Sequence, residues 1–334
     1  MLAVSRFPTP SLPRLLFLAL GFSLFCYLLI HLGPSQILQL LLSIGWGFLL
    51  VLAIYPFYEF SRAAALGKCI GGEGCSYADL IKIRLAGAAV EHLTFTGPFL
   101  AEPAKALLLR NRGLSAPRAF AATVAEYLAY SFSSAIMAVA GLLYIMEKFR
   151  LSPPVTLAAR IIVGFAALYI AASAAAILGR IYLLGSILNS FAKLPFIGQR
   201  IRAGQTALRA TEDGLFSILR VPRRLLSILA LDFLAQAFLV LELFVLLRSA
   251  SRPFSASAPF LIESATKFIN LGFFFVPGQM GAAEGVYAVV FHAMGLAASV
   301  GFSVALARRL RNLLFSGAGL GFLTVLRRRS LRAG

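Results

Sequence analysis

Long apolar segments separated by short polar ones run through the chain. Two apolar stretches, about 80–112 and 260–296, are interrupted by Gly, Pro and charged residues. Spanning helices need about 20 apolar residues. Six stretches meet this need, roughly 14–32, 36–58, 119–146, 155–184, 225–248 and 298–326. The pattern predicts an all-α, polytopic membrane helix bundle with about six full spans and two broken helices.

The first broken stretch contains the turn TFTGPFLAEP followed by a short helical limb. Basic residues before and after it, in 59–84 and 105–118, should face the cytoplasm, because cytoplasmic loops carry the excess of Lys and Arg. The limb from Glu102 to Arg112 rises only about 16 Å, roughly half of a ~30 Å hydrocarbon core. We therefore expect a re-entrant hairpin, whose break must be buried in protein or face a wet cavity.

The second broken stretch aligns with the first when Glu284 is placed on Glu102, an offset of 182 residues (284 − 102). The same offset places Gly295 on Gly113; chance similarity is the alternative, because small residues are common here. Three predicted spans separate the two stretches, so the second should enter from the opposite side. Such an inverted repeat, with the site formed by broken helices, is typical of secondary transporters. The predicted half-repeats of this single membrane domain are residues 1–146 and 155–328.

Composition and charge agree with a membrane protein. The chain of 334 residues is 60% hydrophobic, and its mean hydropathy is +0.86. Its net charge of +18 indicates membrane topology and not nucleic acid, because no basic soluble module is present. We expect both termini in the cytoplasm, with 14–32 kept as a helix; a secretory signal is the alternative. The basic segment 185–224 is either an interfacial amphipathic helix or a solvated loop.

Catalytic and metal-binding patterns are missing from the sequence. There is no Walker element, no H-E-x-x-H and no G-x-S-x-G, and three histidines and three cysteines show no metal-ligand spacing. We expect no enzyme activity, no metal and no cofactor. Any transport would be passive or coupled to protons or to the membrane potential, for which buried carboxylates are the expected groups.

Seven of the 13 acidic residues fall within apolar stretches. A charge at the bilayer centre costs about 2.5–3.5 kcal/mol on insertion scales, so these residues should pair, protonate or face water. They are Glu91, Glu102, Glu126, Asp232, Glu242, Glu263 and Glu284.

Glu102 precedes Pro103 at the start of the limb, and Lys105 lies three residues later on the same face. Two interpretations stay open. The pair either seals the helix start, or the half-helix N-terminus and Lys105 hold a lipid phosphate while Glu102 binds a cation or a proton. Glu284 should play the matching part in the second half. The predicted binding residues are Glu102, Lys105, Glu284, Gly278, Gly281 and Arg112.

A second prediction concerns the helices that follow the two limbs. The 182-residue offset aligns Glu126 with Arg308, so an ion pair from Glu126 to Arg308 or Arg309 is expected to join the repeats, either as a gate or as a static contact. The alternative is one full span over 284–306, which would put the arginines in an external loop.

These motifs resemble the transmembrane, flippase-like domain of lysylphosphatidylglycerol synthases, including stand-alone relatives associated with hopanoid biosynthesis. The first family element, G-E-P-x-K, is matched by 101–105, where Ala101 replaces the usual Gly, and r-x-G-x-s by the region around Arg112. The second, P-G-x-x-G-x-x-E-g, is matched by 277–285, with Gly278, Gly281 and Glu284 in place.

The resemblance implies a lipid translocator, or a helper of lipid export, in the cytoplasmic (inner) membrane of a bacterium. It does not name the lipid, which could be anionic or isoprenoid. The synthase members carry a further soluble transferase domain, so lysyl transfer is not expected from these residues. The second hypothesis is a non-transporting subunit that presents lipid to a biosynthetic enzyme, with 185–224 as the partner surface. A membrane transferase acting on a polyprenyl lipid is a weaker third. Oligomeric state is left open.

Overall fold

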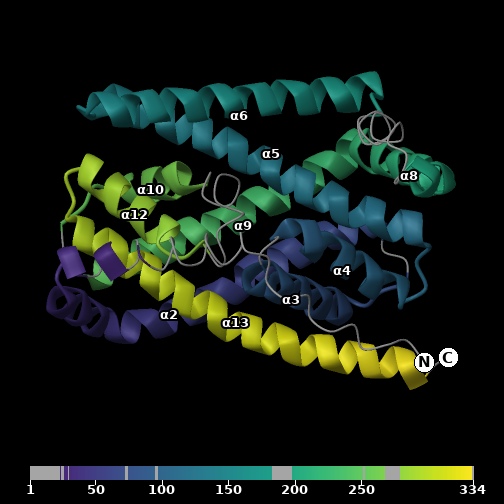
Figure 1. Cartoon of the computed structure of the whole chain (residues 1–334), viewed down its shortest axis with the longest axis horizontal. Helices are drawn as coiled ribbons and strands as arrows, with labels where there is room; N and C mark the ends of the chain where they lie inside the picture. The colour runs from purple at the N-terminus through teal and green to yellow at the C-terminus, as the bar shows by residue number, and fades with distance from the viewer. Residues whose placement is uncertain are drawn as a thin grey trace.

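The computed structural model describes residues 23, 26–28, 30–71, 74–94, 97–182, 198–250, 253–267 and 279–332, and the regular elements in this part of the chain are α-helices. They are α2 (Pro34–Ile70), α3 (Tyr77–Leu93), α4 (Pro98–Arg110), α5 (Ala116–Lys148), α6 (Pro153–Gly179), α8 (Gly198–Leu219), α9 (Pro222–Ser249), α10 (Ala258–Thr266), α12 (Ala282–Ala293) and α13 (Ala298–Arg332). Figure 1 shows α6 along one long edge and α13 along the opposite edge. The predicted all-α class is confirmed.

Four helices in the described part of the chain are long and apolar enough to cross a membrane: α2, α5, α6 and α9. They coincide with four of the six predicted spans. The predicted span 298–326 lies within α13, which is long enough but carries three arginines in its first half. Of the predicted first span, 14–32, only residues 23, 26–28 and 30–32 are described, so most of this prediction lies outside the described residues.

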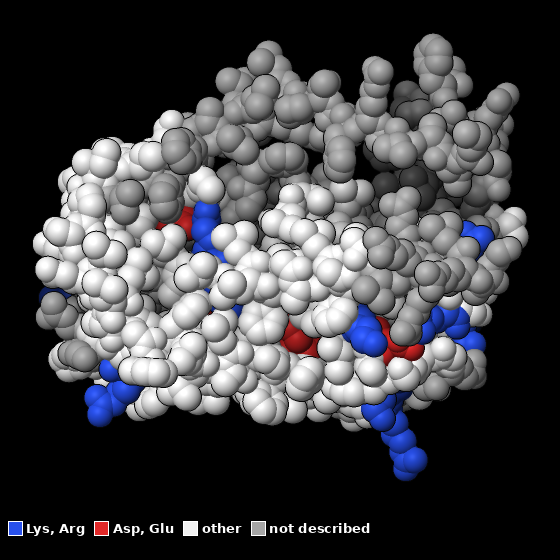
Figure 2. Space-filling view, turned by 90° about the horizontal axis from the view of Figure 1, so that it is seen from below, with Lys and Arg blue, Asp and Glu red and all other residues white. Residues whose placement is uncertain are grey.

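The surface of the bundle is largely apolar. Charged side chains are sparse on the face in Figure 2. Only Ala159 and Ala176 of α6 are buried, whereas Phe165, Leu168 and Leu178 on the same helix are more than 60% exposed. Soluble proteins rarely expose apolar side chains so continuously. This surface therefore suits lipid, in agreement with an integral membrane protein.

Helix α2 continues well beyond the predicted end at residue 58. It kinks at Gly45, passes Pro56 and ends at Ile70, followed by Gly71 in the left-handed conformation. The predicted end of this span at residue 58 was wrong, because the helix continues to Ile70. Glu59 and Arg62 stay inside the bundle because neighbouring helices supply partners of opposite charge, as described below.

Helices α3 and α4 form an antiparallel hairpin. At its open end, Arg112 Nη1 lies 2.9 Å from Asp79 Oδ2. Nearer the turn, a methyl group on Gly87 would lie only 2.5 Å from Cγ of Lys105, so the two helices pass closely there. Both ends of this broken stretch therefore lie at one end of the molecule. They lie beside Ile70 at the end of α2, whose carbonyl accepts a hydrogen bond from Arg118 (3.1 Å).

Local backbone geometry recurs with the offset of 182 residues. Gly113 and Gly295 both have positive φ, 98° and 74°, which favours glycine. In each corner the next residue, a leucine, donates its N–H to the carbonyl five positions earlier, at 3.4 Å in the first half and 2.9 Å in the second. Helices α5 and α13 begin at Ala116 and Ala298, also 182 residues apart. The two corners are thus equivalent structures.

Two other predictions are decided by the helix boundaries. A single span over 284–306 is wrong, because α12 ends at Ala293 and α13 starts at Ala298, with the arginines inside α13. For the basic segment 185–224, the alternative of a solvated loop is wrong over 198–219, because these residues form α8. Residues 183–197 lie outside the described part. Tyr182 donates a hydrogen bond of 2.7 Å to Asp213 of α8, which raises the pKa of the tyrosine.

The buried apolar side chains form two main cores. One joins α2, α3, α4 and α5 with parts of α8 and α9, and the other joins α9, α10, α12 and α13 with α2, α5 and α6. A small group of Tyr55, Tyr58, Ala235 and Leu239 lies apart from both. The charged groups described next are buried alongside this aromatic group.

Candidate functional site

A buried carboxylate on α5 is the centre of the first charged cluster. Glu126 accepts hydrogen bonds from Nε of Arg62 on α2 (2.6 Å) and from Nζ of Lys105 on α4 (3.0 Å). Lys105 Nζ also lies 2.8 Å from Oε1 of Glu102. Glu126 and Lys105 are 0% exposed and Arg62 is 2% exposed. Three helices are therefore held together by charges that water does not reach.

Glycine makes room for the long side chain at this centre. Gly87 of α3 lies against the stem of Lys105, so the absence of a Cβ lets the ammonium reach α5. On the opposite side of α4, Phe99, Leu100 and Leu107 are exposed. Helix α4 thus points its ionic groups toward the protein and its apolar groups toward the surroundings, the opposite of an amphipathic helix in a soluble protein.

Further charges extend the first cluster. Glu59 Oε2 lies 3.4 Å from Arg84 Nε, and Asp232 of α9 lies 3.5 Å from Nε of Arg62. The formal charges are four negative (Glu59, Glu102, Glu126, Asp232) against three positive (Arg62, Arg84, Lys105). Within the described part of the chain, neither oxygen of Asp232 accepts a hydrogen bond, nor does Oε2 of Glu102. The cluster thus carries one excess negative charge and unused acceptors.

The second cluster has a guanidinium at its centre. Nη1 of Arg308 on α13 donates to Oε2 of Glu263 on α10 (2.5 Å) and to the hydroxyl of Tyr287 on α12 (2.5 Å). Its Nε lies 3.2 Å from Glu242 on α9, which also pairs closely with Arg311. With Lys267 bonded to Glu263, this cluster has three positive charges against two negative ones.

The two centres occupy equivalent positions of the repeat with opposite charge. The offset of 182 relates Glu126 to Arg308, and it also relates Lys105 to Tyr287. In each half these two positions are in contact, Lys105 with Glu126 and Tyr287 with Arg308. The same helix crossing therefore uses an acidic centre in the first half and a basic one in the second.

Two tyrosines connect the clusters. The hydroxyl of Tyr55 donates to Glu59 (2.9 Å) in the first cluster, and the guanidinium carbon of Arg311 in the second lies 4.1 Å from its ring centroid. The ring of Tyr130 lies 3.5 Å from the guanidinium carbon of Arg62 and 5.9 Å from Nζ of Lys267. Such cation–π contacts favour buried cations. The charged groups form one continuous buried network.

Glu284 lies in a third, local arrangement. It accepts a hydrogen bond from the backbone N–H of Gly281 (2.8 Å) at the start of α12 and pairs with Arg309 (2.7 Å). Gly281 has φ of 77°, so it supplies the turn as well as the donor. Gly278 lies outside the described residues. The expected carboxylate at the second helix start is present and neutralised by α13.

The predicted ion pair between the repeats is not formed. Glu126 binds Arg62 and Lys105, and Arg308 binds Glu242 and Glu263, while Arg309 pairs with Glu284. Each centre takes its ion-pair partners from its own half: Glu126 binds side chains of α2 and α4, and Arg308 binds side chains of α9 and α10. The predicted pair, whether as a gate or as a static contact, is therefore replaced by separate ion pairs in each half.

The two acidic elbows are not in contact either. Glu102 belongs to the first cluster and Glu284 pairs with Arg309, and Figure 1 shows α4 and α12 separated along the length of the molecule. Arg112 lies away from both, in the partly exposed pair with Asp79 at the open end of the hairpin. The described binding residues thus occupy three places: Glu102 with Lys105, Glu284 with Gly281, and Arg112. Only Glu102 and Lys105 belong to the continuous network.

Sequence reasoning missed Glu59, Arg62 and Arg84 because it assigned them to a cytoplasmic loop. A signal existed: Tyr55, Tyr58, Glu59 and Arg62 follow helical spacing on one face. Asp232 and Gln236, four residues apart on α9, share a buried face, and Gln236 donates to Ser133 (2.7 Å). Among the described residues, no group of His, Cys, Asp and Glu is placed to hold a metal.

The sequence was then compared with known proteins. The model of one family, described as the lysylphosphatidylglycerol synthase TM region, matches residues 15–319. The chain belongs to this family. No curated protein matches it, and no solved structure does. Family membership makes it a membrane protein of lipid biology, and both charged clusters lie within the matched residues.

Proposed function

We propose that this protein moves a membrane lipid across the bilayer, with the headgroup passing along the buried charged network. The observation that carries the proposal is Lys105, fully buried in the middle of the short helix α4 between Glu102 and Glu126; α4 begins at Pro98, before the start at Glu102 predicted from the sequence. Buried ionisable groups in a membrane protein are costly and commonly mark a substrate or proton path. Membership of the family supports a role in lipid biology.

The hairpin geometry supports a re-entrant arrangement. Helix α4 has 13 residues and rises about 20 Å, less than a ~30 Å hydrocarbon core. The Arg112–Asp79 pair keeps both ends of the hairpin at one end of the bundle, where Lys68 and Arg110 are exposed. We assign this basic end to the cytoplasm. Helix α13 then crosses as a further span and returns its C-terminal end to the same side.

Exchange of ionic partners at Lys105 is the proposed binding step. A lipid phosphate replaces Glu102 on the ammonium, while Glu126 keeps its pairing with Arg62. Glu102 has one oxygen without a hydrogen bond, so it is the partner most easily displaced. It then takes a proton or the cationic part of the headgroup. The acyl chains stay along the exposed apolar face of α4, outside the network.

A liposome assay tests this function. Fluorescent phospholipid is placed in one leaflet, and its arrival in the other is followed after reconstitution of the wild type, Glu102→Gln, Lys105→Met and Glu147→Gln. Glu147 is an exposed carboxylate, 73% exposed, paired with Lys148, so it is the matched control. We expect at least tenfold slower transfer for the first two variants and unchanged transfer for the control. Equal rates for all four proteins would refute the proposed path.

A second candidate is a non-transporting subunit that presents lipid to a biosynthetic enzyme. The observation in its favour is the basic surface of α8 and the start of α9, where Arg209, Arg220 and Arg223 are exposed. Replacing all three by Glu separates the two functions. Loss of association with an enzyme, without loss of lipid transfer, would favour the subunit.

A further inference from the structure

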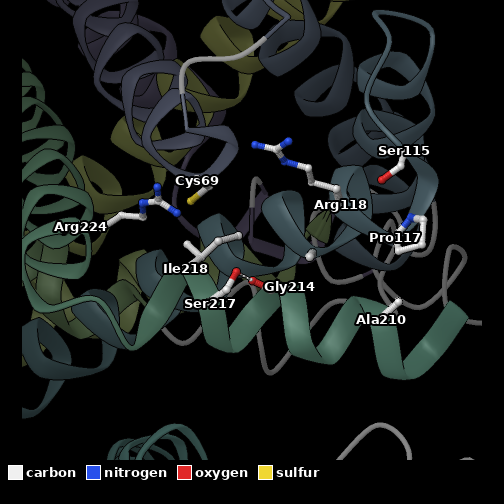
Figure 3. A pocket seen from close by; sticks show the side chains of 10 residues that line it. Cys69, Ser115, Pro117, Arg118, Ala210, Gly214, Ser217, Ile218 and Arg224 are labelled. Atoms are coloured by element: carbon white, nitrogen blue, oxygen red, sulfur yellow. Dashed lines mark hydrogen bonds between the residues drawn. The ribbon is translucent and has the colours of Figure 1, made fainter. Parts of the chain in front are cut away.

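A cavity of about 420 Å³ lies at the basic end of the molecule, outside the charged network. It is lined by the end of α2, the start of α5, the C-terminal half of α8 and the start of α9. From α8 it receives three small residues, Ala210, Gly214 and Ser217, and the larger Ile218. Figure 3 shows Arg118 and Arg224 extending into this space from different helices, with Cys69 between them.

The two guanidinium groups lie close to one point. A methyl group on Gly71 would lie 3.6 Å from Nη2 of Arg224 and 3.7 Å from Nη2 of Arg118. Nη2 of Arg118 also donates a hydrogen bond to the carbonyl of Ile70. Arg224 is half-buried and has no ion-pair partner within the described part of the chain. Guanidinium groups held this close attract an anion, and their planar donors match phosphate oxygens.

The start of α5 adds to the positive potential of the cavity. Ser115, its N-cap, lines the cavity and makes no capping hydrogen bond with its side chain. The first N–H groups of a helix lack intrahelical acceptors, and a helix start carries a partial positive charge. A phosphate in the cavity would supply the missing acceptors.

We propose that this cavity binds the phosphodiester of an anionic membrane phospholipid. Ala121 and Ile218 line it next to the arginines, so it offers apolar surface for glycerol and chain ends as well as charge. Arg118 and Glu126 are eight residues apart on α5, about 12 Å along the helix. A headgroup held in the cavity therefore lies two helical turns from the Lys105 centre. We infer that the cavity holds the headgroup before it reaches Lys105. This role rests on the proposed translocation, whereas the binding of phospholipid to the cavity does not depend on it.

Binding to the full-length protein tests the assignment. Short-chain phosphatidylglycerol is titrated against the wild type, Arg224→Gln, Arg224→Lys and Arg223→Gln in neutral detergent, with Kd measured by a tracer lipid. Arg223 is the exposed neighbour of Arg224 and serves as the matched control. We expect Arg224→Gln to weaken binding about tenfold, Arg224→Lys to restore part of it, and Arg223→Gln to bind like the wild type.

Two further measurements are needed: competition by inorganic phosphate distinguishes a lipid from a free anion, and the Lys105 variant distinguishes binding in the cavity from the proposed translocation. If inorganic phosphate competes at millimolar concentration and phosphatidylglycerol does not bind, the lipid assignment is overturned. Equal Kd values for Arg224→Gln and Arg223→Gln overturn the site. Lys105→Met should slow transfer but leave unchanged the part of phosphatidylglycerol binding that Arg224→Gln removes. A variant that loses transfer but keeps this binding therefore reports on the charged network. A variant that loses binding but keeps transfer reports on the cavity.

Discussion

Replacing Lys105 by Met should destabilise the protein strongly. The substitution keeps the apolar stem beside Gly87 but removes the ammonium that lies 2.8 Å from Glu102 and 3.0 Å from Glu126. Breaking a buried ion pair costs about 3–5 kcal/mol, because a charge is left buried without its partner. Glu126 keeps Arg62, so the loss falls mainly on Glu102. We therefore expect a decrease of about 3 kcal/mol in the free energy of unfolding.

Unfolding by SDS in mixed micelles, followed by circular dichroism, provides the measurement. The control is Lys148→Met, because Lys148 pairs with Glu147 at 3.8 Å and its side chain is 55% exposed. Such exposed pairs contribute about 0–1 kcal/mol, so this variant should unfold like the wild type. A size-exclusion profile confirms that both variants are folded before the titration.

A double-mutant cycle shows whether the loss comes from the ion pair. Glu102→Gln removes the charge that Lys105→Met leaves without a partner, so the double variant should recover about 2 kcal/mol relative to the sum of the single changes. If Lys105→Met is as stable as Lys148→Met, or if the coupling energy is close to zero, the reasoning is refuted.

Three other predictions concern packing, topology and the bridge between clusters. Gly87→Ala places a methyl 2.5 Å from the stem of Lys105 and should cost about 1–3 kcal/mol by overpacking, measured in the same titration. Single cysteines at Lys82 and Arg112, in a chain without its native cysteines, should react with an impermeant maleimide from the same side; labelling from opposite sides would contradict the hairpin. Tyr55→Phe removes one hydrogen bond to a carboxylate and should cost about 1.5–3 kcal/mol, while Tyr55→Leu should cost more, since it also removes the ring under a guanidinium.

Much of the fold could be predicted from the sequence because apolar runs and glycine corners are local signals. Four predicted spans, both Gly-Leu corners and the 182-residue offset between α5 and α13 follow from such signals. The end of α2 could not be predicted in this way. Glu59 and Arg62 look like loop residues until Arg84 and Glu126 are known to lie beside them.

The partners of the buried charges were also beyond the sequence. Seven acidic residues were expected to pair, protonate or face water, and six of them take ion-pair partners: Glu102, Glu126, Asp232, Glu242, Glu263 and Glu284. Aligned positions in a repeat need not touch one another, however. Glu126 and Arg308 are equivalent positions in separate halves, and each finds its ion-pair partners in its own half.

Asp232 joins the two halves electrostatically. Within the first half, three carboxylates (Glu59, Glu102, Glu126) balance three cations (Arg62, Arg84, Lys105), and the fourth carboxylate of the first cluster, Asp232, comes from α9 of the second half. The second cluster keeps Lys267, Arg308 and Arg311 against Glu242 and Glu263, so the two described clusters together hold six charges of each sign and cancel. A phosphate diester that enters this interior upsets the cancellation by one unit, and electrical measurements on reconstituted vesicles should therefore reveal whether a counter-ion travels with it.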